Sequence, residues 1–540
     1  MSGIEASADD SIDLDRVLGI STVRDPSARA MLLSAVRDLG RDGATFTVRR
    51  LDQLVAIEDH FQSLLMYGQL DFLRQPFGAA DGDRDFALNV QRIWLEAANG
   101  FQRFLRNRSA WAREREGEER VLHATGLAMN AIHGFVKWGS LLNEPGRGAP
   151  WRQLHALYSL AEADGYARDP FVLHASEPDF RTSVEALYLR ALLFDMLNTG
   201  SLTKAQMEIA DGWLAAWCRD YSLDAQAVAG RHFLTVDLAA EAGMEPLARG
   251  GPGANPRYLR ADPIGAQIDA TKAELRHGRV HCETGAGAVF PIEEHAALLA
   301  SVEKLHRAII GGGESRLEPR TVFEDREVDV TTGIERVMRK LREPPGAPGA
   351  SPAPAAAIAS MEIIEVSPAG LSVLARDPHI PGAVLEAPTA DPEVQRWRVQ
   401  DMSGRGYGLL VDRGAADGVL LHGIVALRNH ETGGWIVGSV VRKQPSRGRG
   451  EVLVGIEVLG YRPIPVELAP ESLPEVPAAF LPGDDRGGGS DALLLPLAAF
   501  RAGSRFALRA QGERYELQLN RITGKGADWI SARFEIESKA

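Results

Sequence analysis

Hydrophobic residues over residues 26–225 recur with the spacing of amphipathic helices. In the stretch Arg49–Leu70, apolar side chains stand three and four positions apart, and the stretch Phe86–Phe104 repeats this pattern. The segment Val184–Leu197 is apolar nearly all round, which is typical of a helix buried inside a bundle. Short connections between such helices predict helical hairpins, which could stack as in tetratricopeptide arrays.

Residues 226–342 mix two kinds of pattern. Residues 264–277 and 293–309 have helical spacing, whereas residues 322–330, with the sequence VFEDREVDV, alternate like a strand. Residues 343–358 follow, with the sequence EPPGAPGASPAPAAA over most of their length. Proline and alanine at this density cannot build a packed core, so we expect a linker that is extended where the prolines cluster.

Beyond this linker, the hydrophobic period changes from that of helices to that of strands. Residues 451–458 alternate between inward and outward positions, as a strand with one buried face does. Residues 423–428 and 435–442 flank a glycine-rich turn and predict a hairpin. Short strands separated by turn residues favour a β-barrel or a sandwich.

Together these patterns predict a multidomain α+β protein, with a helical N-terminal region followed by a β-barrel region. The length of 540 residues exceeds what one core supports, and 45% hydrophobic and 25% charged residues are ordinary for globular domains. In chain order we expect seven segments. These are a disordered N-terminus (1–25), a helical domain (26–225), a mixed α/β segment (226–342), a linker (343–358), a barrel (359–465), a second Pro/Gly-rich linker (466–490) and a C-terminal β-hairpin extension (491–540).

Charge and cysteine content narrow the functional classes. A net charge of −13 argues against a nucleic-acid partner, although it leaves room for a local basic pocket. The two cysteines, Cys218 and Cys282, have neither disulfide-framework nor zinc-site spacing, which favours a reducing compartment. The N-terminus lacks the features of a secretory signal, and no apolar run approaches the roughly 20 residues that span a bilayer. We expect a cytoplasmic protein without a membrane span.

One motif in the barrel region carries a chemical hypothesis. Residues 401–406 read Asp401-Met402-Ser403-Gly404-Arg405-Gly406, a D-x-S-x-x-G pattern followed by the apolar segment YGLLV. The segments VGSVV at 437–441 and LVGIEV at 453–458 come next. This order resembles the PilZ domain over roughly residues 390–460, within what looks like a long bacterial protein with a helical N-terminal region. The resemblance implies a small β-barrel that binds the second messenger cyclic di-GMP.

The chemistry of the motif suits such a ligand. Guanidinium groups can bind the two phosphates of cyclic di-GMP and stack on its guanines. The resemblance places Asp401 at the acidic position of the site, Ser403 at the serine position, and Gly406 where the backbone turns close to the ligand. The same three residue types also favour an Asx-type turn between two strands without any ligand.

Receptors of the PilZ family also carry R-x-x-x-R upstream of the aspartate. Here Arg396 and Arg398 precede Asp401 closely, and Arg398 is a candidate ligand residue, but their spacing departs from that pattern. The nearest R-x-x-x-R is formed by Arg316 and Arg320, on the far side of the predicted linker. Either the strand-like segment that these arginines open belongs to the barrel, with the linker as an insertion, or they are solvated arginines at a domain edge.

These observations lead to two hypotheses of different classes. In the first, the protein is a cyclic di-GMP effector without enzymatic activity, metal or cofactor, in which a helical region contacts a protein partner. In the second, a PilZ-like scaffold binds no nucleotide and acts only through protein–protein contacts. A Cys–His nucleophile at Cys282 is a third alternative, which a pocket holding this cysteine and a histidine would favour.

Overall fold

In the computed structural model, the chain forms two compact units, residues 1–315 and 316–540. The described residues are 13–41, 46–75, 81–111, 117–143, 149–197, 199–247, 253–260, 262–280, 289–311, 320–343, 363–367, 370–374, 393–428, 434–446, 450–470, 475–483, 491–500, 504–510 and 513–539. The first unit is mainly helical and the second is built of β-barrels, which confirms the predicted α+β class.

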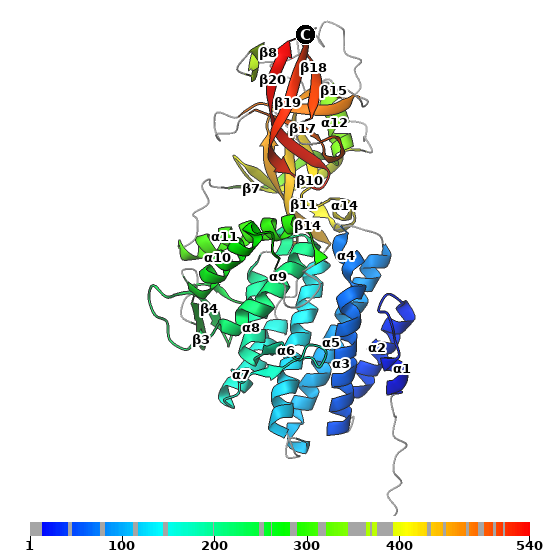
Figure 1. Cartoon of the computed structure of the whole chain (residues 1–540), viewed down its shortest axis with the longest axis vertical. Helices are drawn as coiled ribbons and strands as arrows, with labels where there is room; N and C mark the ends of the chain where they lie inside the picture. The colour runs from blue at the N-terminus through cyan, green and yellow to red at the C-terminus, as the bar shows by residue number, and fades with distance from the viewer. Residues whose placement is uncertain are drawn as a thin grey trace, which may run out of the picture. The chain divides into compact units, whose positions relative to one another are not determined.

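The core of the first unit is a bundle in which α3, α5 and α6 lie side by side (Figure 1). The predicted helix over Arg49–Leu70 corresponds to α3, and tetratricopeptide-like stacking stays a prediction. Among the helices of the described residues, none is long and apolar enough to cross a bilayer. The helices to residue 217 are α1 (Leu14–Leu18), α2 (Pro26–Leu39), α3 (Val48–Gly68), α4 (Leu70–Arg74), α5 (Asp81–Arg106), α6 (Gly117–Leu141), α7 (Ala149–Ala163), α8 (Val184–Met196) and α9 (Lys204–Trp217).

The central helix α6 is buried along most of its length, because glycines let its neighbours approach closely. A Cβ atom added at Gly134 would lie 2.6 Å from Cδ2 of Trp94 on α5, and one at Gly126 would lie 2.2 Å from Cζ of Phe171. The helix α9 begins with a capping box in which Thr203 and Gln206 satisfy each other's backbone N–H groups. Close packing around α6 and the capping box of α9 thus stabilise the bundle.

The N-terminal prediction was partly wrong. Residues 1–25 were expected to be disordered, and residues 1–12 lie outside the described part of the chain. Residues 13–25, however, contain α1, whose Val17 is buried, and Val23 is also fully buried in the core of the bundle. Burying these two side chains removes apolar surface from water, which offsets the entropy of ordering the segment.

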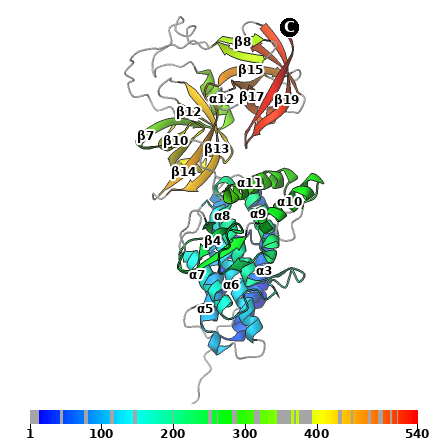
Figure 2. The same ribbon diagram turned by 90° about the vertical axis from the view of Figure 1, so that its left-hand side faces the viewer.

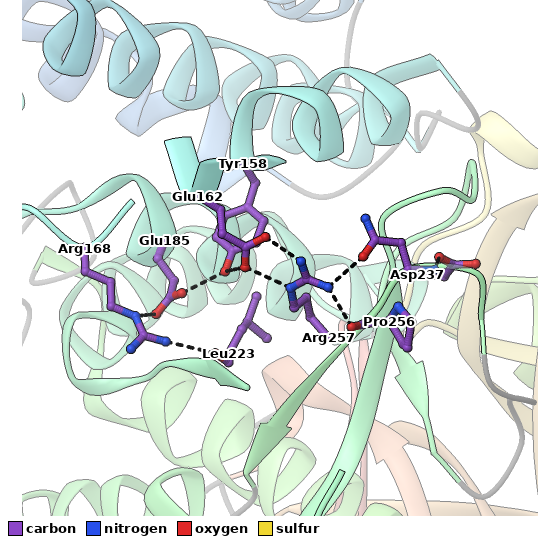
Figure 3. A network of polar contacts seen from close by, with 9 residues as sticks. Tyr158, Glu162, Arg168, Glu185, Leu223, Asp237, Pro256 and Arg257 are labelled. Atoms are coloured by element: carbon purple, nitrogen blue, oxygen red, sulfur yellow. Dashed lines mark hydrogen bonds and ion pairs between the residues drawn. The ribbon is translucent and has the colours of Figure 1, made fainter. Parts of the chain in front are cut away.

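A small sheet and two helices complete the first unit. A polar network joins this sheet to the bundle (Figure 3): Arg257 binds Glu162 on α7, with Nη2 and Oε2 2.5 Å apart. Tyr158 donates to Glu185 at 2.8 Å, and Arg168 binds both Glu185 and the carbonyl oxygen of Leu223. The added elements are β1 (Phe171–Val172) paired with β2 (Arg181–Thr182), the sheet β3 (Leu223–Asp224), β6 (Pro256–Arg260), β4 (His232–Asp237) and β5 (Glu245–Pro246), and the helices α10 (Asp262–Arg276) and α11 (Ile292–Ile310).

The second unit opens with a closed six-stranded barrel in the order β10-β11-β14-β13-β12-β7. Its first strand, β7, comes from the segment predicted as mixed α/β, so residues 226–342 are divided between the two units. The predicted linker, residues 343–358, lies outside the described residues apart from Glu343. The strands are β7 (Thr321–Thr332), β10 (Gln395–Ser403), β11 (Gly406–Asp412), β12 (Ile424–Arg428), β13 (Trp435–Pro445) and β14 (Glu451–Gly460); α14 (Arg413–Asp417) follows β11, and β8 (Ile363–Ser367) pairs with β9 (Gly370–Leu374).

A second closed barrel replaces the predicted second linker and hairpin extension, in the order β15-β16-β17-β20-β19-β18. Residues 466–490 were expected to be a linker because of their prolines and glycines. In the structure, Ile464, Val466 and Leu468 point into the barrel core, whereas Pro465 lies on the exposed face of the same strand. The strands are β15 (Ile464–Pro470), β16 (Val476–Leu481), β17 (Ala492–Pro496), β18 (Arg505–Ala510), β19 (Glu513–Lys525) and β20 (Trp529–Lys539).

The helix α12 (Ile334–Arg342) lies between the two barrels (Figure 2). Its apolar side chains share one core cluster with residues of both barrels, among them Ile424 of the first and Trp529 of the second. Asp528 ties the three parts together, since it accepts hydrogen bonds from the backbone N–H of Ile334 at 2.7 Å and of Ile424 at 3.0 Å. The two barrels are therefore joined by a shared apolar core and by the bridging carboxylate of Asp528.

Replacing Asp528 by alanine should loosen this junction. The N–H groups of Ile334 and Ile424 would lose their acceptor, and a buried unsatisfied donor costs about 1–3 kcal/mol. We expect faster hydrogen exchange of these two amides in Asp528→Ala, whereas the exposed control Glu475→Ala should leave them unchanged. Unaltered protection in Asp528→Ala would show that the carboxylate does not hold the barrels together.

Candidate functional site

The D-x-S-x-x-G motif forms the hairpin between β10 and β11. Ser403 pairs with Gly406, so that Gly404 and Arg405 make a two-residue turn. The carbonyl oxygen of Arg405 accepts a hydrogen bond from the N–H of Val458 at 3.0 Å. A Cβ atom added at Gly406 would lie 2.4 Å from the carbonyl oxygen of Ile456, so β11 and β14 require a glycine there.

A β-bulge in β10 turns Asp401 onto the outer face of the barrel. Val399 pairs with Leu409, and both are buried inside the barrel, but the next pair along is Asp401 with Gly408. Gln400 is the extra residue of the bulge. In a regular pairing, Gln400 and not Asp401 would stand opposite Gly408. Such bulges re-aim side chains and occur often beside functional sites.

The structure brings Arg320 to Asp401 from 81 residues earlier in the chain. Arg320 directly precedes β7, and the pairing of β7 with β10 places Val322 opposite Asp401. Nη1 of Arg320 donates a hydrogen bond to Oδ1 of Asp401, and the two side chains are 28% and 18% exposed. A carboxylate and a guanidinium thus meet at a surface from which a ligand can reach both.

The other candidate residues have different surroundings. Arg316 lies outside the described residues. Arg398 lies on β10 but forms an ion pair with Glu451 of β14, so it is engaged away from the Arg320–Asp401 pair. Ser403 is half-buried at the end of β10, with its Oγ 3.4 Å from the N–H of Arg405. The structure therefore joins Arg320 to Asp401, while Ser403 and Gly406 lie at the end of the same hairpin.

The hairpin also contacts an aromatic residue, Tyr461, which the sequence patterns do not single out. The hydroxyl of Tyr461 donates a hydrogen bond to the carbonyl oxygen of Gly404, and the residue is 39% exposed. An exposed aromatic ring beside the turn offers a surface on which a base could stack. The two residues are 57 positions apart, so no local pattern in the sequence connects them.

A second group of charged side chains lies inside the helical unit, around a cavity of about 60 Å³. Asp211 of α9 accepts hydrogen bonds from Nε2 of His133 and Nζ of Lys137 at 2.7 Å, and from Nε of Arg190 at 2.6 Å. Lys137 also lies 2.6 Å from Glu208. These contacts join α6, α8 and α9.

The electrostatics of this group indicate a structural role. Burial would raise the pKa of Asp211, but Arg190, Lys137 and His133 together hold it well below its ordinary value. Burial lowers the pKa of His133 more than Asp211 raises it, so His133 is neutral. The carboxylate of Asp211 therefore stays charged and is bound by side chains of two other helices, which makes it a clamp between helices.

Metal-ligating side chains do not cluster in the described part of the chain. Within those residues, no group of three or more His, Cys, Asp and Glu side chains could hold a metal ion. Cys218 is fully buried, and burial raises the pKa of its thiol, which disfavours the reactive thiolate. Cys282, the candidate nucleophile of the third alternative, lies outside the described residues.

Comparison with known proteins finds a family model that matches the helical region. Residues 20–227 match the family model for the N-terminal domain of the cyclic-di-GMP receptor FimW. The matched stretch is about two fifths of the chain and contains α2 to α9. No curated protein and no solved structure matches the chain. The match ends before the first barrel begins, so the PilZ resemblance of that barrel depends on its own motif and fold.

The Asp211 cluster leads to a stability prediction. The substitution Asp211→Asn keeps the shape of the side chain but leaves the buried cation of Arg190 without its counter-charge. Breaking one partner of a buried ion pair costs about 3–5 kcal/mol, so the urea midpoint of the helical unit should fall, as followed by far-UV circular dichroism. The exposed substitution Glu118→Gln on α6 is the control; equal midpoints for both variants would contradict the proposed clamp.

Proposed function

We propose that this protein is a cyclic di-GMP-responsive effector, in which the first barrel binds the nucleotide and the helical region contacts a protein partner. The observation that carries the proposal is the contact between Arg320 and Asp401 across 81 residues of chain. It supports the interpretation that Arg316 and Arg320 are the R-x-x-x-R of a PilZ-like barrel, with residues 344–392 as an insertion. The family matched by residues 20–227, described as that of a cyclic-di-GMP receptor, supports the same ligand.

The chemistry of the grouped residues suits a cyclic dinucleotide. A guanidinium has five N–H donors, so Arg320 can keep Asp401 as one partner while the others bind phosphate or its plane stacks on guanine. Asp401 holds Arg320 in place before the ligand arrives, which lowers the entropy cost of binding. Ser403 adds a hydroxyl, and Gly406 keeps the turn free of a Cβ atom.

In this proposal the helical region transmits the signal. The first unit would contact its protein partner through its own surface, and nucleotide binding to the first barrel would change which conformations the protein populates. A ligand shifts such an equilibrium only by its difference in affinity for the two states. The family description of residues 20–227, as the N-terminal domain of a receptor, is the observation that favours this division of roles.

Calorimetric titration of cyclic di-GMP into the full chain tests the proposal. We expect micromolar or tighter binding, weakened about ten- to hundredfold in Asp401→Ala and in Arg320→Ala, since each loses charge-assisted hydrogen bonds. Arg396→Ala is the matched control, because Arg396 lies on the same strand β10 but faces Asp329 at 3.6 Å. Absence of binding by the wild-type protein would sink the effector proposal and favour a scaffold that acts through protein contacts alone.

A substitution at Gly408, which pairs with Asp401, tests the position of this carboxylate without removing it. A Cβ atom at Gly408 would lie 2.6 Å from Oδ1 of Asp401, so Gly408→Ala should displace the carboxylate from Arg320. We expect cyclic di-GMP to bind about fivefold more weakly, as for the loss of one hydrogen bond of about 1 kcal/mol. Gly414→Ala, with nothing within 4 Å of the added atom, should bind as the wild type does. Unchanged affinity in Gly408→Ala would show that the position of Asp401 does not matter.

A further inference from the structure

A second arginine, Arg442 on β13, lies in the same row of paired residues as Asp401, at the other end of that row. The pairing across β10, β11, β14 and β13 forms one row: Asp401 opposite Gly408, Gly408 opposite Gly455, and Gly455 opposite Arg442. Directly paired residues project to the same face of a sheet. Since Leu409 and Val454 are buried inside the barrel, the whole row lies on its outer face.

A second β-bulge brings Arg442 into this row. On β13, Val440 pairs with Ile456 inside the barrel, and the next pair is Arg442 with Gly455, so that Val441 is the extra residue. Without the bulge, Val441 would stand opposite Gly455. The neighbouring Lys443 points inward, where its Nζ donates to the carbonyl oxygens of Ala416 at 2.8 Å and Val419 at 2.7 Å.

Each of the two bulges therefore places a charged side chain beside one of two paired glycines, Gly408 and Gly455. A Cβ atom added at Gly455 would lie 3.3 Å from Cβ and 3.6 Å from Nε of Arg442, so the arginine side chain lies along that glycine. The carboxylate of Asp401 lies against Gly408 in the same way, 2.6 Å from the position of a Cβ atom. Between Asp401 and Arg442, the strands β11 and β14 present only the main chain of two glycines.

We propose that Arg442 is a second phosphate-binding residue of this site, so that the ligand is a molecule with two anionic groups, one held at Arg320 and the other at Arg442. This inference rests on the proposed function, because cyclic di-GMP is such a ligand. The glycine pair would lie beneath the ring of the ligand, where any side chain would obstruct its approach. Arg442 lies outside the D-x-S-x-x-G and R-x-x-x-R patterns.

The test is titration of cyclic di-GMP into wild type, Arg442→Ala, Arg442→Lys and the control Arg396→Ala. Arg442→Ala should bind roughly ten- to hundredfold more weakly, as for a lost charge-assisted contact, and its affinity should depend less on salt concentration. Arg442→Lys should fall between Ala and the wild type, since lysine keeps the charge but not the planar fork. Circular dichroism checks that the variants are folded.

The outcomes separate the two proposals. If the wild type and Arg442→Ala bind equally well with the same salt dependence, while Asp401→Ala is impaired, the role of Arg442 is overturned and the proposed function stands. If Arg442→Lys is as weak as Arg442→Ala, the arginine does not act through its charge and the phosphate assignment is overturned. If the wild type itself does not bind, the proposed function fails, and this inference fails with it.

Discussion

The pairing of β7 with both β10 and β12 is the constraint on which the second unit depends. It closes the barrel and removes two strand edges that would otherwise expose unpaired backbone groups. The same pairing carries Arg320 to Asp401, because Arg320 immediately precedes the strand. It also positions α12. Gly333, which directly follows β7 and has a φ of +86°, makes the turn that leads into this helix between the two barrels. One strand thus joins the candidate site to the junction of the barrels.

The outer face of this barrel is shaped by departures from regular pairing. The bulges at Gln400 and Val441 each give up part of the ladder of hydrogen bonds. The first turns Asp401 toward Gly408, and the second turns Arg442 toward Gly455. The interior tolerates these irregularities because Val399 and Val440, which directly precede the two bulges, and Val454 on the neighbouring strand β14 remain buried. The barrel therefore separates its two tasks: its inner face supplies the stability, and its outer face arranges charges around a strip of backbone.

The helical unit uses charge in the opposite way. Around Asp211, cations and carboxylates are buried and satisfied by one another, which fixes how α6, α8 and α9 pack. Such buried pairs add less to stability than an apolar core would, but they penalise alternative packings, in which a charge would be left alone. At the barrel surface, by contrast, Arg320 and Asp401 are partly exposed and accessible to a ligand. The same residue types serve structure in one unit and suit recognition in the other.

The sequence by itself determined the features that depend on local pattern. Helical spacing located α3 to within two residues, alternation located β14, and the D-x-S-x-x-G motif located the hairpin of the candidate site. It could not determine that β7 closes the first barrel, because strand partners are chosen by pairing across the intervening chain. A proline on the exposed face of β15, Pro465, and the prolines and glycines that follow led to the prediction of a linker where a second barrel begins. Only the tertiary structure decided that Asp401 and Arg442 face the adjacent glycines Gly408 and Gly455, because a bulge shifts the side-chain alternation by one residue without leaving a mark in the sequence.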